Sequence, residues 1–350
     1  MMQKENRIVF FHLGWLGDSV VSIPSMVALR KAFPGAHIIR LVNSRMEEFF
    51  RGCPLVDEVL PFDREAPKVR EGRKLLALLR EKRPTHFFNL HTPDFDRPFR
   101  HYLRDNLFAF LTGAQVRAAY SHSVDSLLLS HSVRREEFGS ERMDREMLRV
   151  VERVTGPVSL TPDEISYWLT DDDRERGRRL IEEAGLSPGR YVAASPFAKR
   201  RSREWGFDRW ERLLSAVKER FGLTPVVLGG RGERRRWEEA FPGGGPAVNL
   251  AGRTTLKTAA ALIEMARFFV GLDSGLSHLA AVLGTPSVVL FGPGNPLLWS
   301  PMNEKGPVRI VRGEAECSPC FLDECDDMRC MTSIPEESVL EEARRVMEEA

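Results

Sequence analysis

Cysteine is scarce in this 350-residue sequence, and four of the five cysteines lie between Cys317 and Cys330. The cysteines that cross-link a small secreted domain are spread through it, so this distribution does not indicate a disulfide framework. The sequence also lacks a secretory signal, because the apolar part of residues 1–17 is short and carries no small-residue cleavage site. We therefore expect a cytoplasmic protein.

Long apolar runs and excess charge are also missing. No stretch approaches the ~20 apolar residues of a membrane-spanning helix. The 51 lysines and arginines nearly balance the 50 aspartates and glutamates, so the formal net charge is +1 and no overall field attracts nucleic acid. The basic runs at 199–201 and 234–236 are short and typical of solvated faces. We expect no nucleic-acid partner, and membrane contact only of a peripheral kind.

The sequence does contain short apolar runs that alternate with amphipathic stretches. Runs at 7–13, 36–42 and 85–90 predict buried strands, and the stretches 19–33 and 68–82 predict helices. We expect Pro24 to kink the first helix or to start its second half. Strands and helices that alternate at this spacing predict an α/β fold with a parallel sheet and helices on both faces.

A second α/β series follows a proline-rich linker at 157–162. We expect a strand at 165–169 to close the first half, and the length favours two domains. The predicted boundaries are 1–162 for the first doubly wound domain and 163–334 for the second. A last helix, at 335–350, has an apolar face that can pack back on the N-terminal domain.

Residues 268–293 read as strand, sharp turn, helix and strand. Asp273 and Ser274 are helix-starting residues, and Gly275 allows the backbone to approach a ligand closely. A helix N-terminus presents unpaired N–H groups and the positive end of a dipole, so the turn is suited to an anion such as phosphate. The alternative is an ordinary βαβ turn that is capped by its own aspartate.

Six motifs in order resemble glycosyltransferase family 9, the heptosyltransferases of lipopolysaccharide core synthesis. They are HLGWLGD at 12–18, SREWGFDRW at 202–210, VVLGGRGE at 226–233, NLAGRTTLKTAAALI at 249–263, GLDSGLSHLAAVLGTP at 271–286 and LFGPGNPLLW at 290–299. The cysteine-rich segment CSPCFLDECDDMRCM is also similar to the family. The resemblance implies a GT-B fold, with two Rossmann-like domains facing across a cleft. It also implies transfer of L-glycero-D-manno-heptose from ADP-heptose to an anionic Kdo–lipid A or heptosylated core acceptor, with inversion and without a metal or other cofactor.

The resemblance makes Asp18 the catalytic base, which suits a carboxylate at the end of a buried strand. The alternative is that Asp18 caps the helix that follows. The family places a lysine where this sequence has Arg203, so either Arg203 or Lys199 would neutralise the donor diphosphate. The first turn, which ends at Asp18, lacks the G-x-G-x-x-G spacing of a dinucleotide site, and this disfavours an NAD oxidoreductase.

The remaining site residues are also implied by the resemblance. Backbone N–H groups of Ser274, Gly275 and Leu276 would hold the donor phosphates, and Asp273 would face a heptose hydroxyl or support the turn. His278 is either a donor ligand or a histidine at the edge of the core. Gly229, Gly230 and Glu233 would approach the adenosine, with Glu233 accepting ribose hydroxyls.

The acceptor site is expected in the first domain, at His91, Arg97, Arg100 and Arg104. Kdo carboxylates and lipid A phosphates are anionic, although the arginines could equally form an exposed basic helix face. Because the acceptor is a lipid, we expect an apolar or basic lip on this domain.

The four clustered cysteines have the spacing C-x2-C-x4-C-x4-C. Four thiolates could hold zinc or an iron–sulfur cluster, but no histidine is near and the spacing departs from that of zinc ribbons. Reduced thiols or a loop disulfide are favoured, and we expect no metal. Two rival functions remain at this point, a family 9 transferase with another sugar donor and a non-catalytic nucleotide-binding protein on the same fold.

Overall fold

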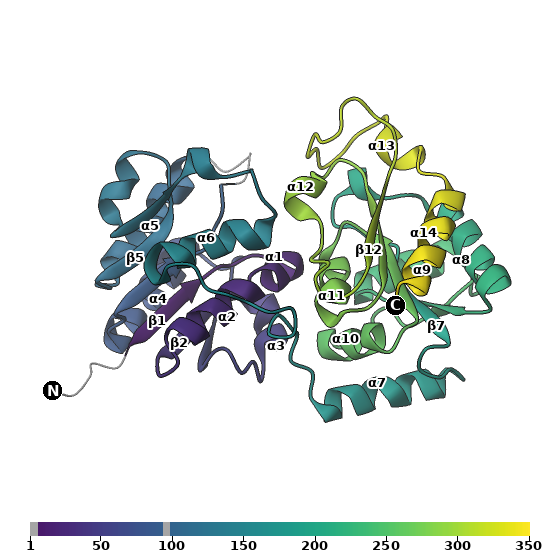
Figure 1. Cartoon of the computed structure of the whole chain (residues 1–350), viewed down its shortest axis with the longest axis horizontal. Helices are drawn as coiled ribbons and strands as arrows, with labels where there is room; N and C mark the ends of the chain where they lie inside the picture. The colour runs from purple at the N-terminus through teal and green to yellow at the C-terminus, as the bar shows by residue number, and fades with distance from the viewer. Residues whose placement is uncertain (1–5, 94–98) are drawn as a thin grey trace. The chain divides into compact units, whose positions relative to one another are not determined.

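The computed structural model describes residues 6–93 and 99–350, and the chain divides into two compact units, 1–168 and 169–350. Each unit is built around its own parallel sheet with helices on both faces (Figure 1). The predicted α/β class with two Rossmann-like units is therefore confirmed. No helix in the described ranges is long and apolar enough to cross a membrane.

The sheet of unit 1 has the strand order β3-β2-β1-β4-β5-β6, and all neighbouring strands are parallel. The strands are β1 (Arg7–Phe11), β2 (His37–Asn43), β3 (Glu58–Phe62), β4 (His86–Asn89), β5 (Val116–Ser121) and β6 (His131–Arg134). The chain runs outward from β1 to β3 and then returns to the other side of β1 with β4. In such a sheet the loops that follow β1 and β4 diverge, and they leave a crevice for a ligand.

Helices cover both faces of this sheet. They are α1 (Leu16–Val21), α2 (Ile23–Ala32), α3 (Glu47–Phe50), α4 (Lys68–Lys82), α5 (Phe99–Leu111) and α6 (Met143–Thr155), with the 3₁₀ helix η2 (Val124–Leu128) after β5. Leu79 of α4 and Ala109 of α5 share a buried cluster with Phe87 of β4, so these two helices lie on the same face. The helix predicted at 19–33 is two helices that meet at Ser22, with Pro24 in the first turn of the second.

Unit 2 repeats the same topology, with the strand order β12-β11-β10-β7-β8-β9. The strands are β7 (Tyr191–Ser195), β8 (Thr224–Val227), β9 (Val248–Asn249), β10 (Phe268–Leu272), β11 (Ser287–Phe291) and β12 (Val308–Arg312). Here the order reverses between β7 and β10, so the loops after these two strands flank the crevice.

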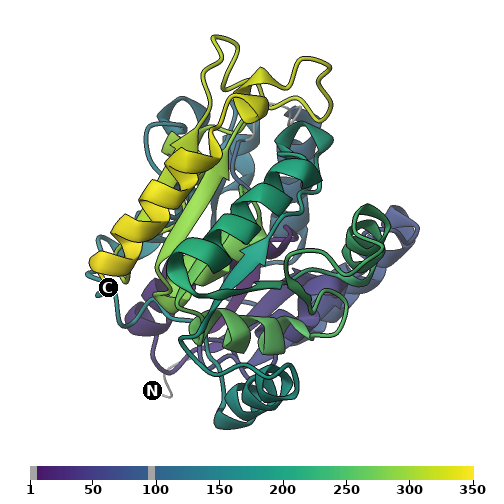
Figure 2. The same cartoon turned by 90° about the vertical axis from the view of Figure 1, so that its right-hand side faces the viewer.

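The helices of unit 2 are α7 (Asp171–Glu183), α8 (Phe207–Phe221), α9 (Arg231–Ala240), α10 (Leu256–Glu264), α11 (Gly275–Leu283), α12 (Pro296–Trp299), α13 (Arg329–Thr332) and α14 (Glu336–Glu348). Helix α14 packs against α8 and strands β10 to β12 (yellow in Figure 2). Its apolar residues Val339, Leu340, Ala343 and Val346 are buried in the core of unit 2. The face that we expected to cross back to the first domain is therefore occupied within its own unit.

The end of unit 1 also differs from the prediction. Residues 165–169 form no strand, and the division between the units falls after Trp168 instead of after residue 162. The segment is anchored by an aromatic contact instead of a strand ladder. The Tyr167 ring stacks on Phe49 at 4.7 Å between ring centroids, and its hydroxyl donates to the Phe49 carbonyl at 3.1 Å.

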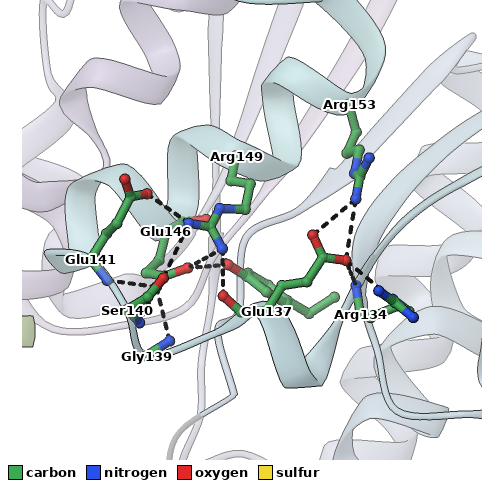
Figure 3. Close-up of polar contacts among 9 residues, drawn as sticks. Arg134, Glu137, Gly139, Ser140, Glu141, Glu146, Arg149 and Arg153 are labelled. Carbon is green, nitrogen blue, oxygen red and sulfur yellow. Dashed lines mark hydrogen bonds and ion pairs between the residues drawn. The ribbon is translucent and has the colours of Figure 1, made fainter.

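A buried carboxylate organises the loop between β6 and α6 (Figure 3). Glu146 Oε1 accepts hydrogen bonds from the N–H groups of Gly139 (2.9 Å), Ser140 (3.2 Å) and Glu141 (3.2 Å). Its Oε2 accepts from the hydroxyl of Tyr120 at 2.6 Å. Burial, followed by this bond to the carboxylate, raises the pKa of Tyr120. A single buried side chain thus satisfies three partly buried backbone donors.

We predict that Glu146→Gln lowers the free energy of unfolding by about 1.5–3 kcal/mol, because it weakens charge-assisted hydrogen bonds in a buried site. Glu141→Gln is the matched control. Glu141 forms an ion pair with Arg149 at 2.7 Å, but its side chain is half exposed. The control should therefore lower the free energy of unfolding by less than about 1 kcal/mol. Urea unfolding followed by circular dichroism measures both losses, and equal losses would contradict the role given to Glu146.

Candidate functional site

Asp18 lies beside the crevice of unit 1, in the first turn of α1. Its Oδ2 accepts a hydrogen bond from the backbone N–H of Trp15 at 2.8 Å. Trp15 is the N-cap and Asp18 is the third residue of α1, so the carboxylate supports the start of its own helix without being its N-cap. A Cβ on Gly14 would lie 2.4 Å from Asp18 Cβ and 2.5 Å from His12 Cε1, so only glycine lets the turn fold this tightly. Sequence reasoning missed His12, which this turn brings next to Asp18.

His91, which follows β4, holds the loop that leads to Asp18. Its Nε2 lies 3.1 Å from the backbone N–H of Leu13 and must accept, since the amide can only donate. Its Nδ1 lies 3.0 Å from Asn89 Oδ1 and 3.3 Å from Asp105 Oδ2, which places the proton on Nδ1. Both ring nitrogens are engaged within unit 1. His91 thus supports the loop that leads to Asp18, and its role as an acceptor ligand stays a prediction.

A pocket of ≈ 750 Å³ opens at this crevice. Asp18, His12 and His91 contribute to its lining. Its other lining residues come largely from α4, α5 and the loop between β3 and α4, and they are both apolar and basic: Arg64, Val69, Arg73, Leu75, Leu76, Arg104, Leu107, Phe108 and Leu111. The pocket can therefore accept a ligand that carries both negative charge and apolar groups.

The predicted arginine cluster is only partly placed at this pocket. Arg104 lines it and pairs with the buried carboxylate of Asp105 at 2.8 Å. Arg100 is exposed on the same helix and does not line the pocket. Arg97 lies outside the described residues.

Arg40 of β2 is a charged residue in the core of unit 1, and its side chain has no exposed surface. Its guanidinium lies 4.2 Å from the ring centroid of Phe10, and Nη2 donates to Ser22 Oγ at 3.3 Å. Burial lowers the pKa of Arg40 to about 9, and the charges of Cys53 and Asp18 oppose that shift. The signal that could have found Arg40 is a charge inside the apolar run HIIRLVN.

In unit 2, the loops after β7 and β10 meet through an ion pair between Arg203 and Asp273. Arg203 Nη1 lies 2.8 Å from Asp273 Oδ2 and donates to the Asp273 carbonyl at 3.1 Å. The Asp273 side chain is 5% exposed, and burial raises the pKa of Asp273 against the opposing charges of Arg203 and Arg200. Arg203 and Asp273, for which separate roles were expected, are therefore joined in one ion pair.

The N-terminus of α11 lies at the same place. Ser274 is the N-cap of this helix, and the N–H groups of the first turn, including those of Gly275 and Leu276, have no acceptor within the helix. Within the described ranges, Ser274 Oγ and Arg203 Nε are buried and have no hydrogen-bond partner. Buried polar atoms are nearly always satisfied, so these donors are suited to an anionic ligand.

The other predicted site residues of unit 2 differ in how exposed they are. Lys199 is exposed on the loop after β7. Its neighbour Arg200 donates to the Phe321 carbonyl at 2.8 Å and pairs with Asp323 at 2.8 Å, so the basic run is not simply a solvated face. His278 is buried in α11, with its ring 6.2 Å from that of Trp299 between centroids.

The glycine turn after β8 forms the start of α9. Gly230 is the N-cap, so the helix begins at Arg231. Glu233 Oε2 accepts the Gly230 N–H at 2.5 Å, and the carboxylate therefore folds over its own turn. A Cβ on Gly229 would lie 2.8 Å from that oxygen and 2.9 Å from the ring of Phe197.

Gly294 is a site residue that sequence reasoning missed. It lies in the loop after β11, and a Cβ there would stand 2.4 Å from Asp273 Oδ2. The loop can pass the buried ion pair only because residue 294 has no side chain. The signal was the Gly-Pro-Gly sequence at 292–294 that directly follows a buried strand.

The clustered cysteines are free thiols. Burial raises the pKa of the Cys330 thiol, and the neighbouring thiols of Cys320, Cys317 and Cys325 raise it further. In the part of the chain that the structure describes, no group of three or more histidine, cysteine or carboxylate side chains is arranged to hold a metal ion. The absence of a metal stays a prediction.

Known proteins are similar to this chain in both sequence and fold. Residues 103–330 match the family model of glycosyltransferase family 9 (heptosyltransferase). The lipooligosaccharide heptosyltransferase 2 of Campylobacter jejuni is 31% identical, over 97% of this chain and 98% of its own length. The lipopolysaccharide heptosyltransferase 2 of Salmonella typhimurium is 25% identical, over 88% of this chain and 89% of its own.

Two solved structures show the same fold. A family 9 glycosyltransferase from Veillonella parvula superposes with a TM-score of 0.84 and 19% identity, and the match covers 100% of this chain and 99% of that one. The ADP-heptose lipopolysaccharide heptosyltransferase II of Escherichia coli superposes with a TM-score of 0.74 and 20% identity. The match covers 99% of this chain and 100% of that one. The crevice of each unit and the matches in sequence lead to one conclusion: this chain belongs to glycosyltransferase family 9, the heptosyltransferases, and is a glycosyltransferase.

Proposed function

We propose that this enzyme transfers L-glycero-D-manno-heptose from ADP-heptose to an anionic Kdo–lipid A or heptosylated core acceptor, with inversion and without a metal. The reaction would take place at the cytoplasmic face of a membrane. The observation that carries the proposal is the donor set at the N-terminus of α11, where Arg203 Nε and Ser274 Oγ are buried without a hydrogen-bond partner among the described residues. Relatives named as lipopolysaccharide and lipooligosaccharide heptosyltransferases support the choice of sugar and acceptor.

The donor would bind to unit 2 through its diphosphate. Arg203 supplies positive charge, and the N–H groups of Ser274, Gly275 and Leu276 supply hydrogen-bond donors. Asp273 holds Arg203 in place through the 2.8 Å ion pair. The guanidinium is therefore oriented before the donor arrives, and less side-chain entropy is lost on binding.

The acceptor would bind in the pocket of unit 1, where the carboxylate of Asp18 takes the proton of the attacking hydroxyl. The acceptor oxygen forms a bond to the anomeric carbon as the bond to the diphosphate oxygen breaks, and ADP leaves with the electron pair. Its developing charge is balanced by Arg203 and the start of α11. Asp18 and the donor site belong to different units, so transfer needs both units to engage their substrates at once.

We predict that Asp18→Asn lowers kcat by about 10²–10⁴-fold, because an amide cannot accept the proton. Asparagine can still accept the Trp15 N–H, so the turn should keep its structure. The affinity for ADP, measured by calorimetry, should stay unchanged. Asp163→Asn, an exposed change in the same unit, is the control. Near-normal turnover by Asp18→Asn would remove Asp18 from the mechanism.

We also predict that Gly294→Ala lowers kcat/KM for the donor on the order of 10²-fold, because the new methyl group displaces Asp273 and with it Arg203. Gly243→Ala is the matched control, since a Cβ at that position meets nothing within 4 Å. Steady-state kinetics against donor concentration measure the effect. If the two alanine variants behaved alike, the ion pair would not position the donor.

A further inference from the structure

Exposed large apolar side chains are gathered on three neighbouring elements of unit 1. They are Val69 and Leu78 of α4, Leu103, Leu107, Phe110 and Leu111 of α5, and Val124 and Leu127 of η2. In the remainder of the described chain, only Leu297 and Leu322 have this character. Single exposed apolar residues need no explanation, but a contiguous group marks a surface that another phase or molecule covers.

Helix α5 carries exposed apolar side chains along its outer face. Its exposed apolar residues are at 103, 107, 110 and 111, a spacing that puts them on one side of a helix. Arg100 and Arg104 fall on the same side at the same spacing, while Tyr102, Asp105, Asn106 and Ala109 point inward. An apolar face with arginines among its residues is typical of helices that lie at a membrane interface.

Arginine contacts join the three elements into one surface. The guanidinium of Arg117 lies 5.3 Å from the ring centroid of Phe110 on α5, and its Nε donates to the Leu128 carbonyl of η2 at 2.6 Å. Arg80 of α4 donates to the Leu111 carbonyl at the end of α5 at 2.7 Å. The contacts leave Leu127 84% exposed and Val124 64% exposed, although burial would stabilise both. We call α5 and η2 together the α5–η2 surface.

The charge on this surface selects an anionic partner. The two carboxylates of α5 and η2, Asp105 and Asp125, are buried. Asp105 pairs with Arg104, and Asp125 accepts from Asn106 at 2.9 Å. On α4, Glu71 pairs with Lys74 at 2.8 Å. The exposed charge of the α5–η2 surface is therefore positive, and it matches anionic lipid headgroups next to an apolar interior.

We infer that the α5–η2 surface docks on a membrane that contains anionic lipid, with Val124, Leu127 and Phe110 inserted among the acyl chains. The surface is continuous with the pocket, because Leu107 and Leu111 both line the pocket and are exposed on α5. A lipid-linked acceptor would thus pass from the membrane to the pocket along α5. The passage of the acceptor to the pocket rests on the proposed function, whereas docking on the membrane does not.

Vesicle co-sedimentation tests the inference with the full chain. The wild type should bind vesicles of phosphatidylethanolamine and phosphatidylglycerol, bind phosphatidylcholine vesicles far less, and dissociate as salt is raised. The double variant Val124→Asp/Leu127→Asp should bind the anionic vesicles about tenfold more weakly. Both side chains are already exposed, so the change should not disturb folding. Leu322→Asp in unit 2 is the control and should bind like the wild type.

Two outcomes would overturn the inference. One is equal vesicle binding by the double variant and the wild type. The other is a wild type that does not bind vesicles but self-associates in analytical ultracentrifugation through Val124 and Leu127, which would make a second copy of the chain the partner. Activity separates this inference from the proposed function: the double variant should turn over a detergent-solubilised acceptor normally and a vesicle-embedded acceptor slowly. No turnover of either acceptor by the wild type would count against the proposed function alone.

Discussion

The reversal of strand order, between β1 and β4 in unit 1 and between β7 and β10 in unit 2, is the constraint on which both sites depend. In a parallel sheet the loops at the carboxyl ends of the two central strands turn away from each other, so the chain cannot close over the sheet at that point. Asp18 and His91 follow the first pair of strands, and Arg203 and Asp273 follow the second. The chemistry of each unit is therefore located by topology before any side chain is chosen.

At both reversals an arginine and a carboxylate interact through their charges. Arg203 is paired directly with Asp273 at 2.8 Å, and the charge of Asp18 acts on the buried Arg40. A buried charge costs desolvation free energy, and replacing such groups by apolar residues often stabilises a protein. Their presence at the two crevices is therefore better explained by electrostatic positioning than by stability. Gly14 and Gly294 serve the same purpose, because each leaves room for a carboxylate.

The sequence predicts the regular elements well where one period dominates. The helix predicted at 68–82 matches α4 to the residue, since its apolar positions have a clear helical period. Strands β5, β6 and β12 have no recognisable sequence signal, because they lie toward the edges of their sheets and mix buried with partly buried or exposed positions.

The roles of individual site residues were harder to predict, because partners distant in the sequence decide them. His91 is directed by Leu13 and Asp105, and Arg203 by Asp273, at separations that no local pattern encodes. Glu233 is the opposite case. Its partner Gly230 is three residues away, so this contact is encoded locally. The resemblance to the family located the motifs, but only the fold showed which side chains meet.

The most direct test of the central claim is the initial rate of sugar transfer by the purified enzyme with ADP-heptose and with a panel of UDP-sugars. Each donor would be offered with Kdo–lipid A and with heptosylated core acceptors. The account predicts transfer from ADP-heptose alone, to at least one of these acceptors. Transfer only from a UDP-sugar would contradict it.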